Sequence, residues 1–177
     1  NRIKNGGEVI LPALQKFGLC VNGIYNFFDF GSETGSPEND RAESLRVIDC
    51  CEKANCKFLL AVAGFLTEDE MVRGSAKYET RRLRMAASLT ELTAEAEKHG
   101  ITVVMEEFDN LTAPYSRADE LMWFMQHVPG LRCGFDTGNF LYNEEDAVKS
   151  FSLFRPYLAS VHCHARAFTD NTVTPCV

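Results

Sequence analysis

The chain has 177 residues, of which 45% are hydrophobic, and carries a formal net charge of −7 at pH 7. This length and composition allow one hydrophobic core, so we expect a single domain over residues 1–177. The acidic balance argues against a nucleic-acid partner, because phosphate backbones require clustered Lys and Arg. The longest apolar run, residues 58–66, is too short to cross a bilayer, so we expect a soluble protein with no membrane partner.

The cysteines and the chain ends carry information about context. The seven cysteines are an odd number without paired metal-ligand spacing. No secretory segment precedes them, so we expect reduced thiols and a cytoplasmic location. The chain starts at Asn1, almost inside a helical pattern, and stops at Val177 shortly after an expected strand. These ends predict that the sequence is part of a longer open reading frame.

The first elements in chain order are a helix, a strand and a second helix. Apolar residues at helical spacing from position 9 to 17, closed by Gly18, predict the first helix. Residues 19–25 have the pattern of a strand, and an aromatic, turn-rich segment follows them. Apolar positions from Ala42 to Cys51 then keep helical spacing, which predicts the second helix.

The same alternation continues to the end of the chain. Strands are expected at residues 58–63, 101–105, 131–135 and 158–162. Helices are expected over residues 78–96, after a Ser116 cap, and after an Asn143 cap with acidic residues in its first turn.

Alternating strands and helices imply a parallel sheet, either open or closed into a barrel. Antiparallel pairing is not expected, because no tight hairpin signal such as Asn-Gly lies between the strands. Five strands are visible, whereas a complete eightfold barrel needs about 250 residues. We therefore expect an α/β fold of the (β/α)8 TIM-barrel type that is incomplete, with the first strand and the last two strands missing.

Three of the expected strands end on side chains that can bind a metal ion: Glu106, Asp136 and His162. In a parallel sheet or barrel, the carboxyl ends of all strands lie on one face, so these residues converge. Two carboxylates and an imidazole at one point form the start of a divalent-metal site.

The alternation of side chains along a strand supports the same site. Glu106 shares a strand face with Thr102 and Val104, and the small residues Gly134 and Ser160 lie on the faces that carry the other two ligands. Small inward residues beneath larger polar ones fit a barrel interior that opens toward a ligand. Glu107 points to the opposite face, and we expect it to be solvated or paired with a helix, as we do Asp109.

Residues 100–106 (GITVVME), 134–139 (GFDTGN) and 161–164 (VHCH) resemble the xylose isomerase-like barrel family. That family groups sugar phosphate isomerases and epimerases, inosose-processing enzymes and family-2 apurinic endonucleases. The resemblance covers nearly the whole chain and implies one divalent ion held by Glu, Asp, His and a final Glu on the eighth strand. Glu106, Asp136 and His162 match the first three positions, and the fourth has no counterpart in the sequence.

The resemblance also bears on substrate contacts. Many relatives carry a His three residues after the Asp, where it binds substrate or a further metal, and Asn139 replaces it here. A multi-zinc endonuclease site is therefore disfavoured, while Asn139 remains a candidate substrate-binding residue. Further candidates for contact with the substrate are His164, Arg166 and Tyr25. Their structural alternatives are a place at the mouth for His164, an ordinary surface position for Arg166, and core packing for the Phe27 and Phe28 rings that follow Tyr25.

The expected function is metal-dependent isomerisation or epimerisation of a small sugar or sugar phosphate. A divalent ion (Mn²⁺, Mg²⁺, Co²⁺ or Zn²⁺) would stabilise a cis-enediolate as a Lewis acid. Glu106 is the candidate for a catalytic proton-transfer role as well as for metal binding. Two alternatives use the same architecture: a keto-inositol dehydratase with this metal site, and a barrel that binds a sugar without turnover. A phosphodiester-cleaving repair enzyme is opposed by the acidic charge and by Asn139.

Overall fold

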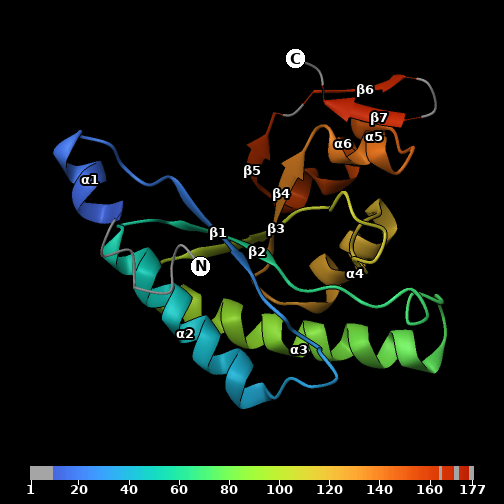
Figure 1. The fold of residues 1–177 in the computed structure, drawn as a ribbon, viewed down its shortest axis with the longest axis horizontal. Helices are drawn as coiled ribbons and strands as arrows, with labels where there is room; N and C mark the ends of the chain where they lie inside the picture. Colours follow the sequence, from blue (N-terminus) through green and yellow to red (C-terminus); the bar gives the residue numbers. More distant parts are fainter. Residues whose placement is uncertain (1–9, 164, 170–171, 176–177) are drawn as a thin grey trace.

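The computed structural model describes residues 10–163, 165–169 and 172–175 (Figure 1). Its centre is a parallel sheet with the strand order β1-β2-β3-β4-β5. The strands are β1 (Gly23–Phe27), β2 (Phe58–Val62), β3 (Thr102–Met105), β4 (Arg132–Asp136) and β5 (Leu158–His162). Spatial order follows chain order, as in a barrel, whereas a doubly wound sheet reverses its order at a switch point. The parallel α/β arrangement expected from the sequence is confirmed.

The helices alternate with the strands, and those after β1 cover one side of the sheet, whereas the first helix precedes β1 and has no buried residue. They are α1 (Ile10–Lys16), α2 (Pro37–Lys53), α3 (Ala76–Lys98), α4 (Ala118–His127), α5 (Asn139–Tyr142) and α6 (Ala147–Phe154), with a 3₁₀ turn η1 (Arg155–Tyr157). Figure 1 shows α2 and α3 side by side beneath the first three strands, and these two helices pack on each other. In the described part of the chain, no helix has both the length and the apolarity needed to cross a membrane.

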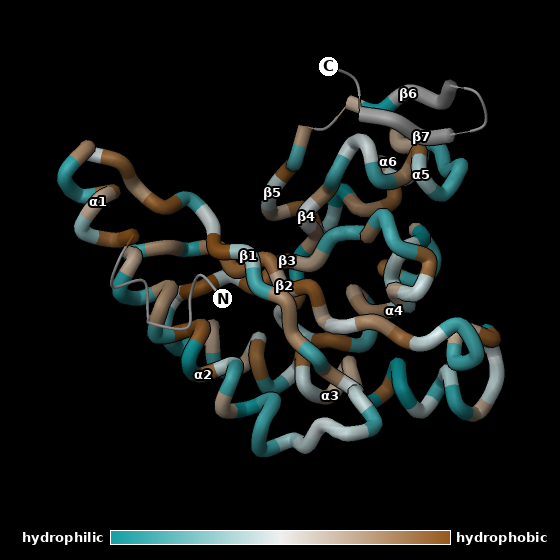
Figure 2. Tube along the Cα trace, viewed as in Figure 1, coloured by the Kyte–Doolittle hydropathy of each residue, from teal (hydrophilic) through white to brown (hydrophobic). Residues whose placement is uncertain are grey.

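The two faces of the sheet differ because side chains alternate along each strand. Leu59, Val103 and Phe135 are buried toward the helices and belong to the hydrophobic core. On the opposite face, which we call the inner face, Val104 and Ser160 line a cavity of about 430 Å³ that lies between the edge strands β1 and β5. Figure 2 shows the central strands as a largely hydrophobic part of the chain, while α2 and α3 alternate between hydrophobic and hydrophilic residues. The inner face is therefore the one that can receive a ligand.

Strand register aligns the carboxyl ends of the last strands. Asp136, the last residue of β4, pairs directly with His162, the last residue of β5. One strand earlier, Met105 at the end of β3 pairs with Cys133, so β4 extends beyond β3 by three residues. Glu106 follows Met105 directly and lies beside this extension.

The helix expected after Asn143 is wrong in its bounds and its cap. Instead, α5 ends at Tyr142, and α6 begins later, with Asp146 as its N-cap. The Asp146 carboxylate accepts hydrogen bonds from the backbone N–H groups of Val148 and Lys149. Asn143 donates its side-chain amide to the Ser116 carbonyl, which ties this turn to the segment before α4. Both Asn and Asp are favourable caps, so the sequence pattern did not discriminate between them.

The expectation of no antiparallel pairing is also wrong for the end of the chain. A two-stranded antiparallel sheet follows β5, formed by β6 (Arg166–Thr169) and β7 (Thr172–Pro175). Thr169 pairs with Thr172 at its closed end. β6 contacts α5, and Figure 1 shows this small sheet beside α5 at one end of the main sheet.

Candidate metal centre

Three side chains from three strand ends meet at the carboxyl edge of the sheet. Glu106 follows β3, and Asp136 and His162 are the last residues of β4 and β5. Each offers one ligand atom, and these atoms all lie within 4.8 Å of one another. Asp136 Oδ2 lies 2.9 Å from His162 Nδ1. The structure therefore brings together the three residues that the sequence singled out.

The two carboxylates are buried, whereas the imidazole is open to solvent. The exposed fractions are 6% for Glu106 and 2% for Asp136, against 65% for the His162 side chain. Asp136 Oδ1 accepts hydrogen bonds from the backbone N–H groups of Gly138 (2.7 Å) and Asn139 (3.1 Å). These bonds hold the carboxylate so that its other oxygen, Oδ2, faces His162.

Glu106 has an oxygen that a cation can satisfy. Among the described residues, its Oε2 is buried with no hydrogen-bond partner, which is costly for a polar atom. Gly134 leaves room beside it, because a Cβ added there would lie 3.8 Å from Glu106 Oε2 and 3.2 Å from Ser160 Oγ. The prediction that small residues lie beneath the ligands is confirmed for Gly134 and Ser160.

Electrostatics favour a cation at this point. The pKa of Glu106 is raised to about 8, chiefly by burial and in smaller part by the nearby charges of Asp136 and Asp109. A divalent ion offsets this concentration of negative charge, and a set of two carboxylates and one imidazole suits Mg²⁺, Mn²⁺, Co²⁺ or Zn²⁺. The residues present therefore fit a divalent metal ion.

Glu107 differs from the expectation that it would be solvated or paired. It is 0% exposed, and neither carboxyl oxygen has a hydrogen-bond partner in the described part of the chain. Burial raises the pKa of Glu107 to about 10, so the group is neutral at pH 7. The strand alternation correctly turns it away from Glu106, but its side chain then enters the layer between sheet and helices.

Aromatic side chains stand beside the acidic cluster. Tyr25 lines the inner cavity. Its pKa is raised to about 12, mainly by burial and to a smaller extent by the negative charges of Glu106 and Asp109. The Phe27 ring packs edge-on against the rings of Tyr25 and Phe108, with distances between ring centres of 5.1 and 6.2 Å.

The expectation of core packing holds for only one of the two Phe residues after Tyr25. Phe28 is buried and stacks on Phe30 at 4.5 Å, as expected. Phe27 is 56% exposed, so the expectation is wrong for this ring. Phe65 joins the group at 5.4 Å from Phe108. Neither Phe65 nor Phe108 was singled out from the sequence, because an aromatic residue after an apolar strand has no distinctive pattern.

The other candidate substrate-binding residues lie in different settings. Asn139 is buried, donates from Nδ2 to the Glu107 carbonyl (2.9 Å) and accepts at Oδ1 from Arg166 Nη2 (3.2 Å). Arg166 Nη2 also donates to Asp109 Oδ2. His164 lies outside the described residues. The structure thus places Asn139 and Arg166 against protein groups next to the metal-ligand cluster.

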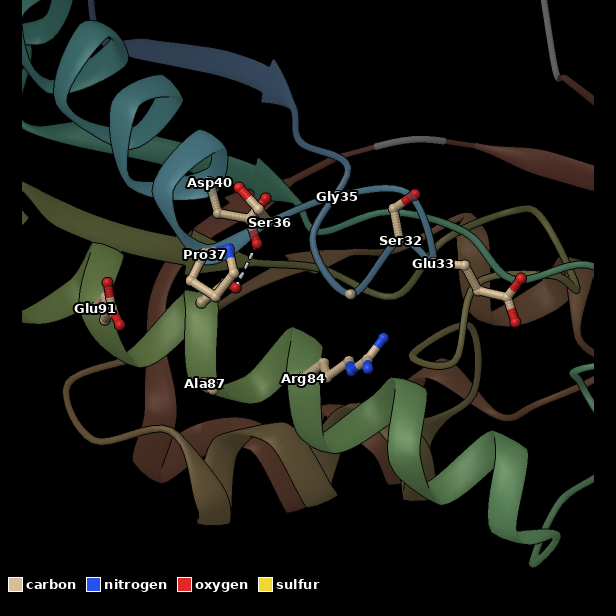
Figure 3. A pocket seen from close by; sticks show the side chains of 11 residues that line it. Ser32, Glu33, Gly35, Ser36, Pro37, Asp40, Arg84, Ala87 and Glu91 are labelled. Atoms are coloured by element: carbon tan, nitrogen blue, oxygen red, sulfur yellow. Dashed lines mark hydrogen bonds between the residues drawn. The ribbon is translucent and has the colours of Figure 1, made fainter.

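A second cavity, of about 300 Å³, lies between the segment before α2 and the side of α3 (Figure 3). Ser36 at its edge accepts a hydrogen bond from the Asn39 backbone N–H, and Asp40 accepts one from Ser88. None of the predicted metal or substrate residues that the structure describes lines this cavity. Its polar groups cap α2 and join it to α3, which is a structural role.

No curated protein sequence matches the chain. Among solved structures, the chain is similar to a probable 3-DHS dehydratase involved in petrobactin synthesis from Bacillus anthracis (TM-score 0.70, 15% identity, 93% of this chain and 57% of that one). It is also similar to a xylose isomerase-like TIM barrel protein from Mycobacterium smegmatis in complex with magnesium (TM-score 0.67, 17% identity, 93% of this chain and 60% of that one). A third similar structure is a 3-keto-D-glucoside 4-epimerase from E. coli (TM-score 0.71, 15% identity, 89% of this chain and 64% of that one).

These structures and a family-level match give the same fold. The chain spans 57–64% of the length of the three structures, in line with five parallel strands of an eight-stranded barrel. A family model described as "Xylose isomerase-like TIM barrel" matches residues 4–173. With the sheet order, the partial coverage and this match together, the chain belongs to the xylose isomerase-like TIM barrel family.

Proposed function

We propose that this protein is an isomerase or epimerase of a small sugar or sugar phosphate that depends on one divalent metal ion. The observation that carries the proposal is the convergence of Glu106, Asp136 and His162 within 4.8 Å at the strand ends. The family and the similarity to a 3-keto-D-glucoside 4-epimerase support carbohydrate chemistry at this edge. Tyr25, Val104 and Ser160 line a cavity on the same face of the sheet, although none of the three candidate ligands is among its described lining residues.

The metal ion would supply Lewis acidity toward the carbonyl oxygen of the substrate. Glu106, Asp136 and His162 would hold it, and the two backbone N–H groups on Asp136 Oδ1 keep that ligand in place. Such fixed outer contacts orient metal ligands.

Glu106 is the group that would take the proton from the carbon next to the carbonyl. Its buried carboxyl, whose pKa is raised to about 8, suits a general base. Tyr25 lines the inner cavity, and the Phe27 ring that packs edge-on against it would add apolar surface on this side of the site.

Solvent deuterium incorporation tests this proposal. The complete gene product is incubated with Mn²⁺ and a panel of ketoses and ketose phosphates in D₂O, and the products are analysed by NMR. We expect deuterium at a carbon next to the carbonyl, its loss after treatment with EDTA, and its return when Mn²⁺ is added.

Two variants sharpen the same experiment. Glu106→Gln should lower exchange by at least about 100-fold, because it removes both the base and an anionic ligand. Glu68→Gln, at an exposed position, should exchange like the wild type. Absence of deuterium with every metal and substrate would contradict proton-transfer chemistry.

A dehydratase is the second candidate, favoured by the similarity to a probable 3-DHS dehydratase. A keto-inositol dehydratase would use the same metal site but release water. Mass spectrometry separates the two, because an isomerase or epimerase conserves the mass of the substrate and a dehydratase lowers it by one water. Sugar binding that is unchanged in metal-free Glu106→Gln protein would instead indicate a binding module without turnover.

A further inference from the structure

Arg166, at the start of β6, joins three segments that surround the metal centre. Its side chain is only 11% exposed, and Nη2 donates both to Asp109 Oδ2 (2.5 Å) and to Asn139 Oδ1 (3.2 Å). Its guanidinium carbon also lies 5.8 Å from the centre of the Tyr142 ring. Asp109 follows β3, whereas Asn139 and Tyr142 begin and end α5. Hydrogen bonds from a guanidinium to a carboxylate are among the stronger ones in proteins.

Asn139 continues this connection to a metal ligand. Its backbone N–H donates to Asp136 Oδ1, and its side-chain Nδ2 donates to the carbonyl of Glu107, the residue after Glu106. A side-chain amide has one acceptor oxygen and one NH₂ group. Arg166 uses the oxygen and Glu107 uses the NH₂ group, so the orientation of the amide is determined on both sides.

We propose that Arg166 is a positioning residue of the metal centre and acts through Asn139 and Asp109. This inference rests on the proposed function. The bond to Asn139 holds the turn after β4, so that Asp136 keeps Oδ2 toward the cation. The bond to Asp109 holds the loop that follows Glu106. Partners of this kind, one contact away from the metal, typically change metal affinity by about 10- to 100-fold when removed.

The first test measures the turn itself and needs no metal. Amide hydrogen exchange of Gly138 and Asn139 is followed by NMR in the metal-free gene product. In Arg166→Met, both amides should exchange about tenfold faster, because the charge-assisted bond that orders the turn is lost. Arg155→Met is the matched control, since Arg155 is exposed in η1 before β5, and its exchange should equal that of the wild type. Unchanged exchange in Arg166→Met would overturn the proposal.

The second test measures metal binding by electron paramagnetic resonance of Mn²⁺. Arg166→Met should bind Mn²⁺ about 10- to 100-fold more weakly, with a changed spectrum of the bound ion. Arg166→Lys should recover part of the affinity, because Lys keeps the charge but lacks the planar fork that reaches two acceptors. Asp109→Asn should weaken Mn²⁺ binding less than Arg166→Met does. If Arg166→Met does not fold, the Mn²⁺ affinity of Asp109→Asn is measured in its place.

The outcomes separate this inference from the proposed function. If Arg166→Met binds Mn²⁺ like the wild type but loses affinity for a phosphorylated ketose, Arg166 contacts substrate and the positioning role is wrong. If the wild type does not bind Mn²⁺, the proposed function fails. The exchange experiment then still decides whether Arg166 orders the turn at Asp136.

Discussion

At the scale of single residues, neighbouring acids have opposite roles at the end of β3. Glu106 faces the inner side of the sheet with Asp136 and His162, while Glu107 is buried on the helix side. Strand alternation predicts these directions from the sequence. The burial of Glu107 was not predictable, because a carboxyl group without a partner is rarely found in a core. The contacts of Arg166 were equally hidden, since Asp109 and Asn139 are far from it in the sequence.

Glu107 predicts a pH-dependent change in stability. The pKa of Glu107 in the folded protein, about 10, lies above its pKa in the unfolded chain. The stability of the protein is therefore highest below the unfolded pKa and falls as pH rises toward 10, because the unfolded chain can ionise Glu107 and the folded protein cannot. Glu107→Gln, which is neutral in both states, should therefore raise the free energy of unfolding by roughly 2 kcal/mol at pH 8 and change it little at pH 4.

Urea denaturation of the complete gene product at both pH values measures this effect. Glu68→Gln, at an exposed position on the segment after β2, controls for the loss of one acid. Equal stability of Glu107→Gln and the wild type at pH 8 would show that Glu107 is not a neutral buried group.

At the scale of elements, strands were predicted more accurately than their connections. The strand expected at 158–162 has the observed bounds, and those at 58–63, 101–105 and 131–135 are shifted by at most one residue at each end. Short apolar runs bounded by turn signals produce this clear signal. β1 begins four residues later than expected, because the apolar residues before Gly23 do not pair with β2. β6 and β7 carry Thr and Val but no Asn-Gly turn, so they lacked the usual hairpin signature.

One close contact joins the segment after β1 to α3, and it can be tested at Gly31. Gly31 has φ +75°, and a Cβ there would lie 2.9 Å from the Arg81 carbonyl oxygen and 3.2 Å from the Met85 nitrogen. Both are backbone atoms of α3 and cannot rotate away. Gly31→Ala should lower the free energy of unfolding by roughly 3 kcal/mol, from backbone strain plus this overlap.

Gly74 offers a matched control for that substitution. Its φ is +77°, but a Cβ there would meet nothing within 4 Å. Gly74→Ala should therefore cost only the conformational penalty, about 1 kcal/mol. Equal losses for the two variants in urea denaturation would mean that the contact between Gly31 and α3 is not tight.

At the scale of the whole molecule, the sheet is an arc of a barrel with an open inner face. Within the described residues, β1 and β5 each pair with only one strand of this sheet, and the cavity of about 430 Å³ lies between them. Strand order and helix alternation made this arrangement predictable from the sequence. The convergence of the ligands was predictable for the same reason, because all parallel strands end on one edge.

The open arc predicts that these 177 residues, when isolated, associate with one another and unfold without a sharp transition. Two strand edges without partners favour association with other chains. The isolated chain should therefore unfold over a broad temperature range and elute as oligomers in size-exclusion chromatography. A sharp thermal transition of a monomer would show that the arc is stable without further strands.

The proposed function depends on the binding of one divalent cation by Glu106, Asp136 and His162. Anomalous diffraction at the manganese edge, from crystals of the complete gene product grown with Mn²⁺, tests it directly. We predict a single peak about 2.2 Å from one oxygen of Glu106, one oxygen of Asp136 and one ring nitrogen of His162. A peak at another place, or none at saturating Mn²⁺, would contradict the metal centre.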